Sequence, residues 1–249
     1  MANYATAHRI GTEDAQYDAV AVHTAPDGAR AYALLDGYVH RPATAQWVAR
    51  EVRRVARAAS RRADAAAGLR HIYQQHATDP ARQMLDDRLR MPKAAATVAV
   101  SVPGGPLTIA WCGDVRAYLL QDGTVRRLTE DHNMRRAQPA NPRFPKGGSR
   151  DFLTSYLGNV HSGEEMLRSF MRHRAVDSVT VTPDGPCRLL LATDGAYEPH
   201  EEAGHDLYEQ LGHGSLIPAV RDFVIGAYET SMTATCTAGN GTALLAELG

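Results

Sequence analysis

Short apolar runs, separated by turn residues, recur through the first forty residues, the middle and the end of the chain. Their length and the Gly and Pro between them predict β-strands joined by hairpins. The predicted strands cover residues 3–9, 19–23, 30–35, 95–102, 107–112, 115–120, 124–128, 177–182, 188–193 and 242–248. The loops between 95 and 128 are too short for crossover helices, so this part is predicted to be an antiparallel meander.

Other parts of the chain carry apolar residues at three- and four-residue steps, which is the spacing of a helix face. Helices are predicted over 43–77, as two helices with Gly68 near their junction, and over 79–89, 163–172, 206–211 and 216–231. Strands and helices therefore fall in separate blocks, which predicts an α+β fold with two antiparallel sheets and helices on the outside. At 249 residues the chain fits one domain spanning 1–249.

Three of the predicted strands end at an aspartate beside a glycine. They are Leu35-Asp36-Gly37, Cys112-Gly113-Asp114 and Thr193-Asp194-Gly195. A glycine lets the backbone turn sharply there. One Asp-Gly pair would indicate only a turn. Three carboxylates at strand ends far apart in the chain favour a site for a hard divalent cation, which prefers oxygen ligands.

Charge and composition exclude several classes of protein. The formal net charge is −1, which argues against a nucleic-acid partner, and the arginines of 50–62 are interpreted as a solvated helix face. Cys112, Cys187 and Cys236 are odd in number and widely spaced, so they predict neither a disulfide framework nor a zinc site. The first ten residues lack the apolar core of a signal peptide, and no apolar run is long enough to span a membrane, so a cytoplasmic protein without a membrane partner is expected.

Between Glu130 and Phe152 the chain loses its periodicity. Three prolines and two glycines interrupt this stretch. A loop of this length usually has a function or is disordered. We therefore predict a mobile flap over about 132–152 that selects the substrate.

Taken in order, the motifs resemble those of the PPM-type (type 2C family) metal-dependent protein serine/threonine phosphatases of bacteria. The motifs that carry the resemblance are Arg9-Ile10-Gly11-Thr12-Glu13-Asp14-Ala15, Leu35-Asp36-Gly37, Gly113-Asp114-Val115-Arg116, Leu128-Thr129-Glu130-Asp131-His132, Leu157-Gly158 and Thr193-Asp194-Gly195. The resemblance spans nearly the whole chain. It implies a four-layer αββα fold, in which helix pairs cover a β-sandwich and the metals lie in a cleft at one end.

The resemblance also implies roles for individual residues. Asp36 would bridge two Mn²⁺ or Mg²⁺ ions, and a third, weaker ion would bind Asp114. The remaining implied ligands are Glu13, the carbonyl of Gly37, and Asp194. Asp14 would support these ligands without binding the metal itself. Arg9 would grip the substrate phosphate, because a guanidinium fork matches phosphate geometry. Two such ions can activate a water for in-line attack on a phosphoserine or phosphothreonine.

Two motifs depart from the family pattern. The second motif continues as Tyr38-Val39-His40 instead of Gly-Gly or a His, and His40 is a weak candidate to replace that His. The last motif reads Gly239-Asn240, where the family has a metal-binding Asp followed by Asn. A glycine offers no side-chain oxygen, so one metal site would be weakened. The alternative interpretation is that Gly239 is an ordinary loop glycine with positive φ.

Two hypotheses follow from these observations. In the first, the chain is an active signalling phosphatase that we expect to be a monomer and whose substrate is a phosphorylated protein. In the second, it is a weak or inactive relative that binds a partner through the same cleft. The histidines do not decide between them, because His8, His200 and His205 have no metal-site spacing and His132 is expected to make a structural hydrogen bond.

Overall fold

The computed structural model describes residues 3–38, 41–84, 90–169 and 173–249. Within these ranges the strands form two five-stranded antiparallel sheets. The first sheet contains, in spatial order, β1 (Tyr4–Arg9), β10 (Gly241–Leu248), β9 (Cys187–Ala192), β6 (Arg116–Gln121) and β7 (Thr124–Arg127). The second sheet contains β2 (Asp18–Thr24), β3 (Arg30–Gly37), β4 (Ala94–Ser101), β5 (Leu107–Cys112) and β8 (Asp177–Val181).

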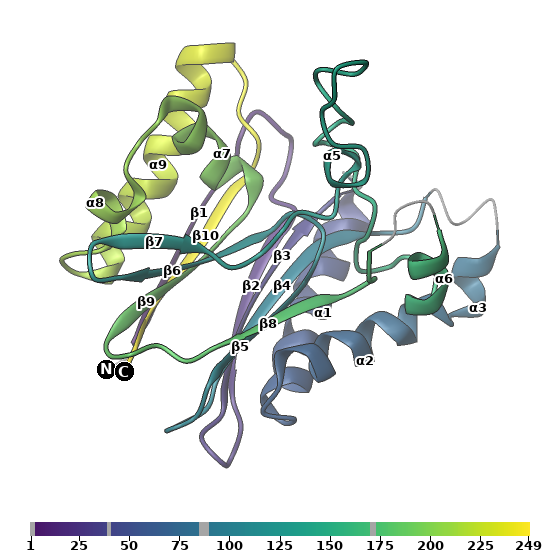
Figure 1. Ribbon diagram of the computed structural model, residues 1–249, viewed down its shortest axis with the longest axis horizontal. Helices are drawn as coiled ribbons and strands as arrows, with labels where there is room; N and C mark the ends of the chain where they lie inside the picture. Colours follow the sequence, from purple (N-terminus) through teal and green to yellow (C-terminus); the bar gives the residue numbers. More distant parts are fainter. Residues whose placement is uncertain (1–2, 39–40, 85–89, 170–172) are drawn as a thin grey trace.

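The two sheets pack face to face on a shared apolar core. Leu34, Ala99 and Ile109 of the second sheet meet Leu189, Leu191 and Leu244 of the first, and all six are buried. Alternation along each strand sends the intervening side chains to the outer face, where helices cover them. The predicted α+β sandwich is therefore confirmed (Figure 1).

Helices form the outer layers. The helices α1 (Pro42–Ser60) and α2 (Ala65–Ala77) cover the second sheet, whereas α7 (Asp194–Ala203), α8 (Leu207–Leu211) and α9 (Leu216–Thr235) cover the first (Figure 1). Gly68 lies near the junction of α1 and α2, as predicted, in the first turn of α2. A Cβ there would lie 2.3 Å from the Cα of Ala59, so the glycine allows the two helices to pack closely.

The predicted meander from 95 to 128 is wrong as a single unit. β4 pairs with β5 and β6 pairs with β7, but β5 pairs with β8 and β6 with β9. The short link between β5 and β6 carries the chain from one sheet to the other. Gly113 permits this step with a φ of +108°, and a Cβ there would lie 2.4 Å from the Cβ of Ala95.

Most predicted helices are present but shorter or longer than expected. α3 (Pro80–Gln83) and α6 (Gly163–Arg168) occupy the starts of the predicted 79–89 and 163–172 helices, whose parts 85–89 and 170–172 lie outside the described residues. α7 was not predicted at all. No helix in the described part of the chain is both long and apolar enough to cross a membrane.

The segment predicted as a flap, residues 132–152, leaves and rejoins the sandwich at one point. The base is closed because Thr154 N donates to His132 O at 2.8 Å and Met134 N donates to Phe152 O at 2.9 Å. Between these contacts lies α5 (Met134–Ala137), followed by a largely exposed loop that projects away from the sheets (Figure 1).

Candidate active site

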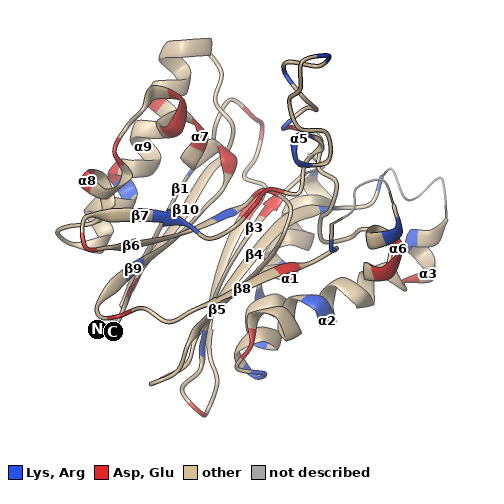
Figure 2. Ribbon diagram, in the orientation of Figure 1, with Lys and Arg blue, Asp and Glu red and all other residues tan. Residues whose placement is uncertain are grey.

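A pocket at one end of the sandwich collects acidic side chains from distant parts of the sequence. It is lined by Glu13, Asp36, Asp114, Asp151 and Asp194. Asp36 lies near the end of β3, Asp114 follows β5, and Asp194 follows β9. The three strand-end carboxylates therefore surround one space. In Figure 2 acidic positions gather where β3 ends and along α7.

Glycines allow the backbones beside these acids to approach closely. A Cβ on Gly37 would lie 2.7 Å from Tyr17 O, and one on Gly195 would lie 2.3 Å from Asn240 O. Neither glycine has a positive φ, whereas Gly113 does. At Gly37 and Gly195 a glycine is needed because another backbone segment of the same chain passes too close for a Cβ.

Burial and mutual repulsion disfavour ionisation of the clustered carboxylates. Burial, followed by the neighbouring Asp18 and Asp194, raises the pKa of Asp36 well above its ordinary value. Burial and Asp194 likewise raise the pKa of Asp114. Burial also raises the pKa of Asp194, although the backbone N–H of Gly195 donates to its Oδ1 at 2.6 Å. A cation placed among these groups would relieve both effects.

The donor set fits a hard divalent cation. The acidic residues that line the pocket offer carboxylate oxygens, which are ligands that Mg²⁺ and Mn²⁺ prefer. In the described ranges, however, no three His, Cys, Asp or Glu side chains already stand in the arrangement of a metal site. Asp36 nevertheless lies within hydrogen-bonding reach of both Asp18 and Asp194.

The last motif of the sequence reaches the pocket at Gly239 and Asn240. The Asn240 side-chain amide donates to Glu13 Oε2 at 2.7 Å and to Ala15 O at 2.8 Å, and its Oδ1 accepts from Gly11 N at 3.0 Å. Asn240 thus secures the loop that carries Glu13.

Gly239 lies beside Asn240 with free space on the side where a side chain would project. Its φ is not positive, so the alternative of a left-handed loop glycine is wrong. A Cβ on Gly239 would have Gly195 Cα, at 3.7 Å, as its only neighbour within 4 Å among the described residues. The backbone and the space would therefore accept an aspartate.

Other predicted site residues lie outside this pocket. The guanidinium carbon of Arg9 lies 4.1 Å from the ring centroid of Tyr228 on α9, and Arg9 is not among the residues that line the pocket. Asp14 is exposed and accepts a hydrogen bond from the Tyr17 hydroxyl at 2.8 Å. Tyr38 does line the pocket and stacks on Tyr156, with ring centroids 6.3 Å apart. Val39 and His40 lie outside the described residues.

Asp18 belongs to this acidic group although it was not predicted. It is the first residue of β2 and pairs directly with Asp36 of β3. Burial and the charge of Asp194 raise the pKa of Asp18 to about 8, against hydrogen bonds from Thr242 and Thr193. Only the strand register reveals this neighbour, because Asp18 and Asp36 are far apart in the sequence.

Glu198 was also not predicted. It lies one turn after Asp194 on α7, and burial followed by Asp194 raises its pKa to about 7. Arg150, from the end of the flap segment, approaches Glu198 at 3.4 Å and Glu202 at 2.6 Å. These ion pairs connect the flap segment to α7 beside the pocket.

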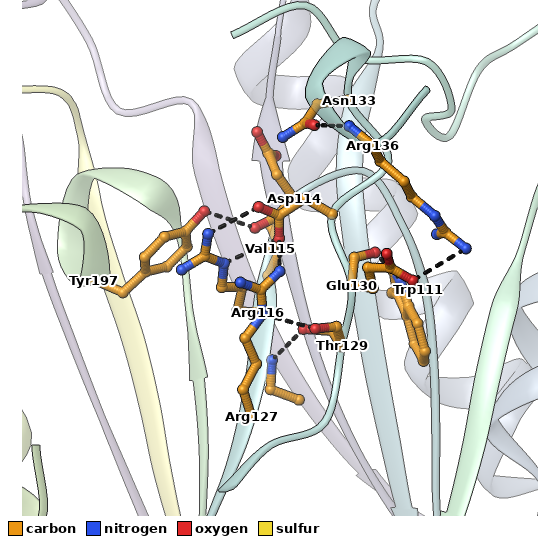
Figure 3. A network of polar contacts seen from close by, with 12 residues as sticks. Trp111, Asp114, Val115, Arg116, Arg127, Thr129, Glu130, Asn133, Arg136 and Tyr197 are labelled. Atoms are coloured by element: carbon orange, nitrogen blue, oxygen red, sulfur yellow. Dashed lines mark hydrogen bonds and ion pairs between the residues drawn. The ribbon is translucent and has the colours of Figure 1, made fainter. Parts of the chain in front are cut away.

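The turn that carries Asp114 is held by a polar network (Figure 3). Arg116 makes a two-pronged ion pair with Asp131, at 2.9 and 2.8 Å, and the Tyr197 hydroxyl donates to Asp114 O at 3.1 Å. Trp111 Nε1 donates to Glu130 O at 2.7 Å. The Leu128–His132 motif therefore acts mainly as a scaffold for the Asp114 turn.

His132 makes a structural contact, as expected. It is fully buried, and its Nε2 lies 3.0 Å from Asp177 Oδ2. Burial lowers its pKa to about 4 although the bond to Asp177 opposes the shift. The neutral ring stacks on His173 with centroids 4.5 Å apart, away from the acidic pocket.

Comparison with known proteins identifies the family. The model of the Protein phosphatase 2C family matches residues 7–138, which is just over half of the chain. No curated protein sequence gives a significant match.

Solved structures with the same fold cover nearly the whole chain. The PPM Ser-Thr phosphatase MsPP from Mycobacterium smegmatis, solved with cacodylate, is 21% identical over 99% of this chain and 98% of its own, with a TM-score of 0.70. Stp1 from Staphylococcus aureus is 16% identical over 100% and 96%, with a TM-score of 0.71. PppA from Pseudomonas aeruginosa is 20% identical over 97% and 95%, with a TM-score of 0.68.

At these identities the structural likeness shows the fold, and the family model carries the assignment. The acidic pocket at the end of the αββα sandwich agrees with it. The chain belongs to the Protein phosphatase 2C (PPM-type) family of protein serine/threonine phosphatases.

Proposed function

We propose that this chain hydrolyses phosphoserine and phosphothreonine in proteins and that it requires Mn²⁺ or Mg²⁺. The observation that carries the proposal is the pocket in which Glu13, Asp36, Asp114 and Asp194 face one another. Buried carboxylates that disfavour one another's ionisation destabilise the fold of the metal-free protein. Such clusters are therefore typical of functional sites, and bound cations would offset the repulsion.

The pocket residues divide into ligands for separate ions. Glu13, Asp36 and the carbonyl of Gly37 would hold one ion, Asp36 and Asp194 a second, and Asp114 a third that binds more weakly. When bound, such ions lower the pKa of a water and neutralise charge on the phosphoryl oxygens. The chain's own residues supply the negative field, and Asn240 fixes Glu13 through the 2.7 Å hydrogen bond.

Arg9 is our proposed ligand for the substrate phosphate. It is exposed at the end of β1, so its long side chain can leave the Tyr228 ring when an anion enters. Asp14 would act indirectly, because it accepts the hydrogen bond of Tyr17, and Tyr17 lines the pocket.

The direct test is hydrolysis of a phosphoserine peptide and of a small aryl phosphate by the metal-free protein. Activity should be absent with a chelator present and should appear on addition of Mn²⁺ or Mg²⁺. Equal rates with and without chelator would contradict the proposal.

The competing proposal is a weak or inactive relative that binds a phosphoprotein through the same pocket. It is favoured by Gly239, which lines the pocket without offering a ligand. The variant Gly239→Asp separates the two proposals, since the space for the side chain is present. An active enzyme with one weak site should gain Mn²⁺ affinity and turnover together. A variant that binds Mn²⁺ more tightly but stays inactive would favour the binding protein.

Further expectations remain part of this proposal. We propose that residues 1–249 act as one domain, that the flap segment 132–152 selects the substrate, and that the protein works as a cytoplasmic signalling monomer. The place of Asp151, near the end of the flap segment, in the pocket lining supports the segment's part in recognition.

A further inference from the structure

We infer that Asp18 restores to the cation site the negative charge that Gly239 fails to provide. Asp18 does not line the pocket, so it acts through Asp36 as a positioning residue and not as a direct ligand. The inference rests on the proposed metal-dependent function.

The first support is the register of β2 and β3. Asp18 and Asp36 are directly paired across the two antiparallel strands. Paired residues project to the same face of a sheet, with Cβ atoms about 4.5–5.5 Å apart. The two carboxylates are therefore held side by side by the backbone, independently of any side-chain rearrangement.

The second support is an unsatisfied oxygen. Asp18 Oδ1 is buried and has no hydrogen-bond partner in the part of the chain that the structure describes. Buried polar atoms are rarely left unpaired. The Asp18 and Asp36 side chains share a hydrogen bond, but that contact leaves Asp18 Oδ1 without a partner. A positive charge shared by the pair would satisfy both groups.

The third support is the position of Asp18 between the two sheets. The Thr193 hydroxyl lies 3.4 Å from Asp18 Oδ2, and Thr193 directly precedes Asp194. The same hydroxyl accepts a hydrogen bond from Thr242 N at 2.9 Å. Asp18 is thus in contact with the strand ends that deliver both Asp36 and Asp194, the two acids that would share a cation.

Charge counting links Asp18 to Gly239. The pocket lacks a carboxylate at Gly239, and Asp18 adds one behind Asp36. A negative charge within a few ångström of a buried cation strengthens its binding even without direct ligation, because screening there is weak. An aspartate at position 239 should therefore compensate for the loss of the Asp18 charge in cation binding.

The experiment measures Mn²⁺ affinity by calorimetry in the full chain. Asp18→Asn keeps the shape but removes the charge, and should weaken binding by at least about tenfold. Asp27→Asn is the matched control, since it removes an exposed carboxylate at the other end of the same hairpin; its affinity should stay within about twofold of wild type. In the double variant Asp18→Asn with Gly239→Asp, affinity should return to within about threefold of wild type.

A second measurement separates this role from a merely structural one. Replacing a buried carboxyl group whose Oδ1 lacks a partner should not lower the melting temperature of the metal-free protein, while Mn²⁺ should stabilise Asp18→Asn less than it stabilises wild type. An Asp18→Asn variant that binds Mn²⁺ as wild type does, or that unfolds or melts lower without metal, overturns the inference. Wild-type protein that binds no Mn²⁺ would instead refute the proposed function and the inference with it.

Discussion

Asp36 is the residue on which the proposed chemistry depends most. The negative charges of Asp18, Asp194 and Asp114 all act on its carboxyl group. Asp36→Asn keeps the volume but removes the charge that would be shared by two ions. We expect essentially complete loss of Mn²⁺-dependent hydrolysis, by about 10³-fold or more. The measurement is single-turnover hydrolysis of an aryl phosphate at saturating Mn²⁺. Turnover equal to wild type would show that the pocket is not the reaction site.

Arg9 tests how substrate reaches the pocket. Because it is proposed to bind phosphate and not to hold metal, Arg9→Ala should leave the Mn²⁺ affinity unchanged. Loss of a charge-assisted hydrogen bond should cost about 1.5–3 kcal/mol in kcat/KM. Steady-state kinetics with the aryl phosphate measures kcat/KM of Arg9→Ala and of wild type.

Tyr228→Leu serves as the comparison for Arg9. It removes the aromatic ring that holds the guanidinium outside the pocket and leaves Arg9 intact. We expect its KM to be equal to or lower than that of wild type. If Arg9→Ala and wild type have the same kcat/KM, Arg9 has no part in binding the phosphate.

The sequence predicted three of the acids that gather at the pocket, but it did not predict Asp18 or the orientation of Arg9. Asp36, Asp114 and Asp194 could be found because each follows an apolar run and stands beside a glycine. Asp18 could not, since its partnership with Asp36 depends on a strand register that one residue of slippage would destroy. The orientation of Arg9 toward Tyr228 depends on helix packing far away in the sequence, and no local pattern reports it.

At the scale of elements, the flap segment offers the clearest experiment. Gly148 N donates to Gln138 O at 2.8 Å, so the chain returns to its starting point across the loop 139–147. Replacing 139–147 by Asn-Gly should close the gap as a tight turn. Arg150 and Asp151 remain, so the contacts to α7 and the pocket lining are kept.

The shortened protein should lose activity on phosphoproteins far more than on an aryl phosphate, since loops carry recognition while the strand ends carry the chemistry. We expect a loss of at least about tenfold on a phosphoprotein and less than about twofold on the small substrate. Parallel kcat/KM measurements on both substrates decide the matter. Equal losses would indicate that the segment supports the pocket and does not select the substrate.

Two elements show why the fold was only partly predictable. α7 begins at Asp194 and contains Gly195 and Pro199, both of which disfavour a helix, yet Tyr197 and Ala196 are buried against α9 and the first sheet. Tertiary packing therefore overrides local preference. The link between β5 and β6 has the length of a hairpin, and the sequence does not distinguish a hairpin from a step between sheets.

At the scale of the whole molecule, pH should affect stability through two opposed groups. Asp18 and Asp36 have raised pKa values, so in metal-free protein their contribution to stability is lost as pH rises through those values. His132 acts in the other direction. Its pKa falls from 6.5 to about 4 on folding, so its contribution is complete above pH 6.5 and is lost as pH falls toward 4.

The variant His132→Gln isolates the second effect, since it keeps a donor toward Asp177 but cannot take up a proton. A pKa difference of about 2.5 units corresponds to about 3 kcal/mol. The stability advantage of wild type over His132→Gln should therefore shrink by about 3 kcal/mol between pH 7 and pH 4. Urea unfolding at several pH values, with constant ionic strength and a chelator present, measures this difference.

The control variant is His8→Gln, at an exposed position on β1. Its free energy of unfolding should follow that of wild type at every pH. A difference between wild type and His132→Gln that does not change with pH would mean that His132 is as easily protonated in the folded protein as in the unfolded chain.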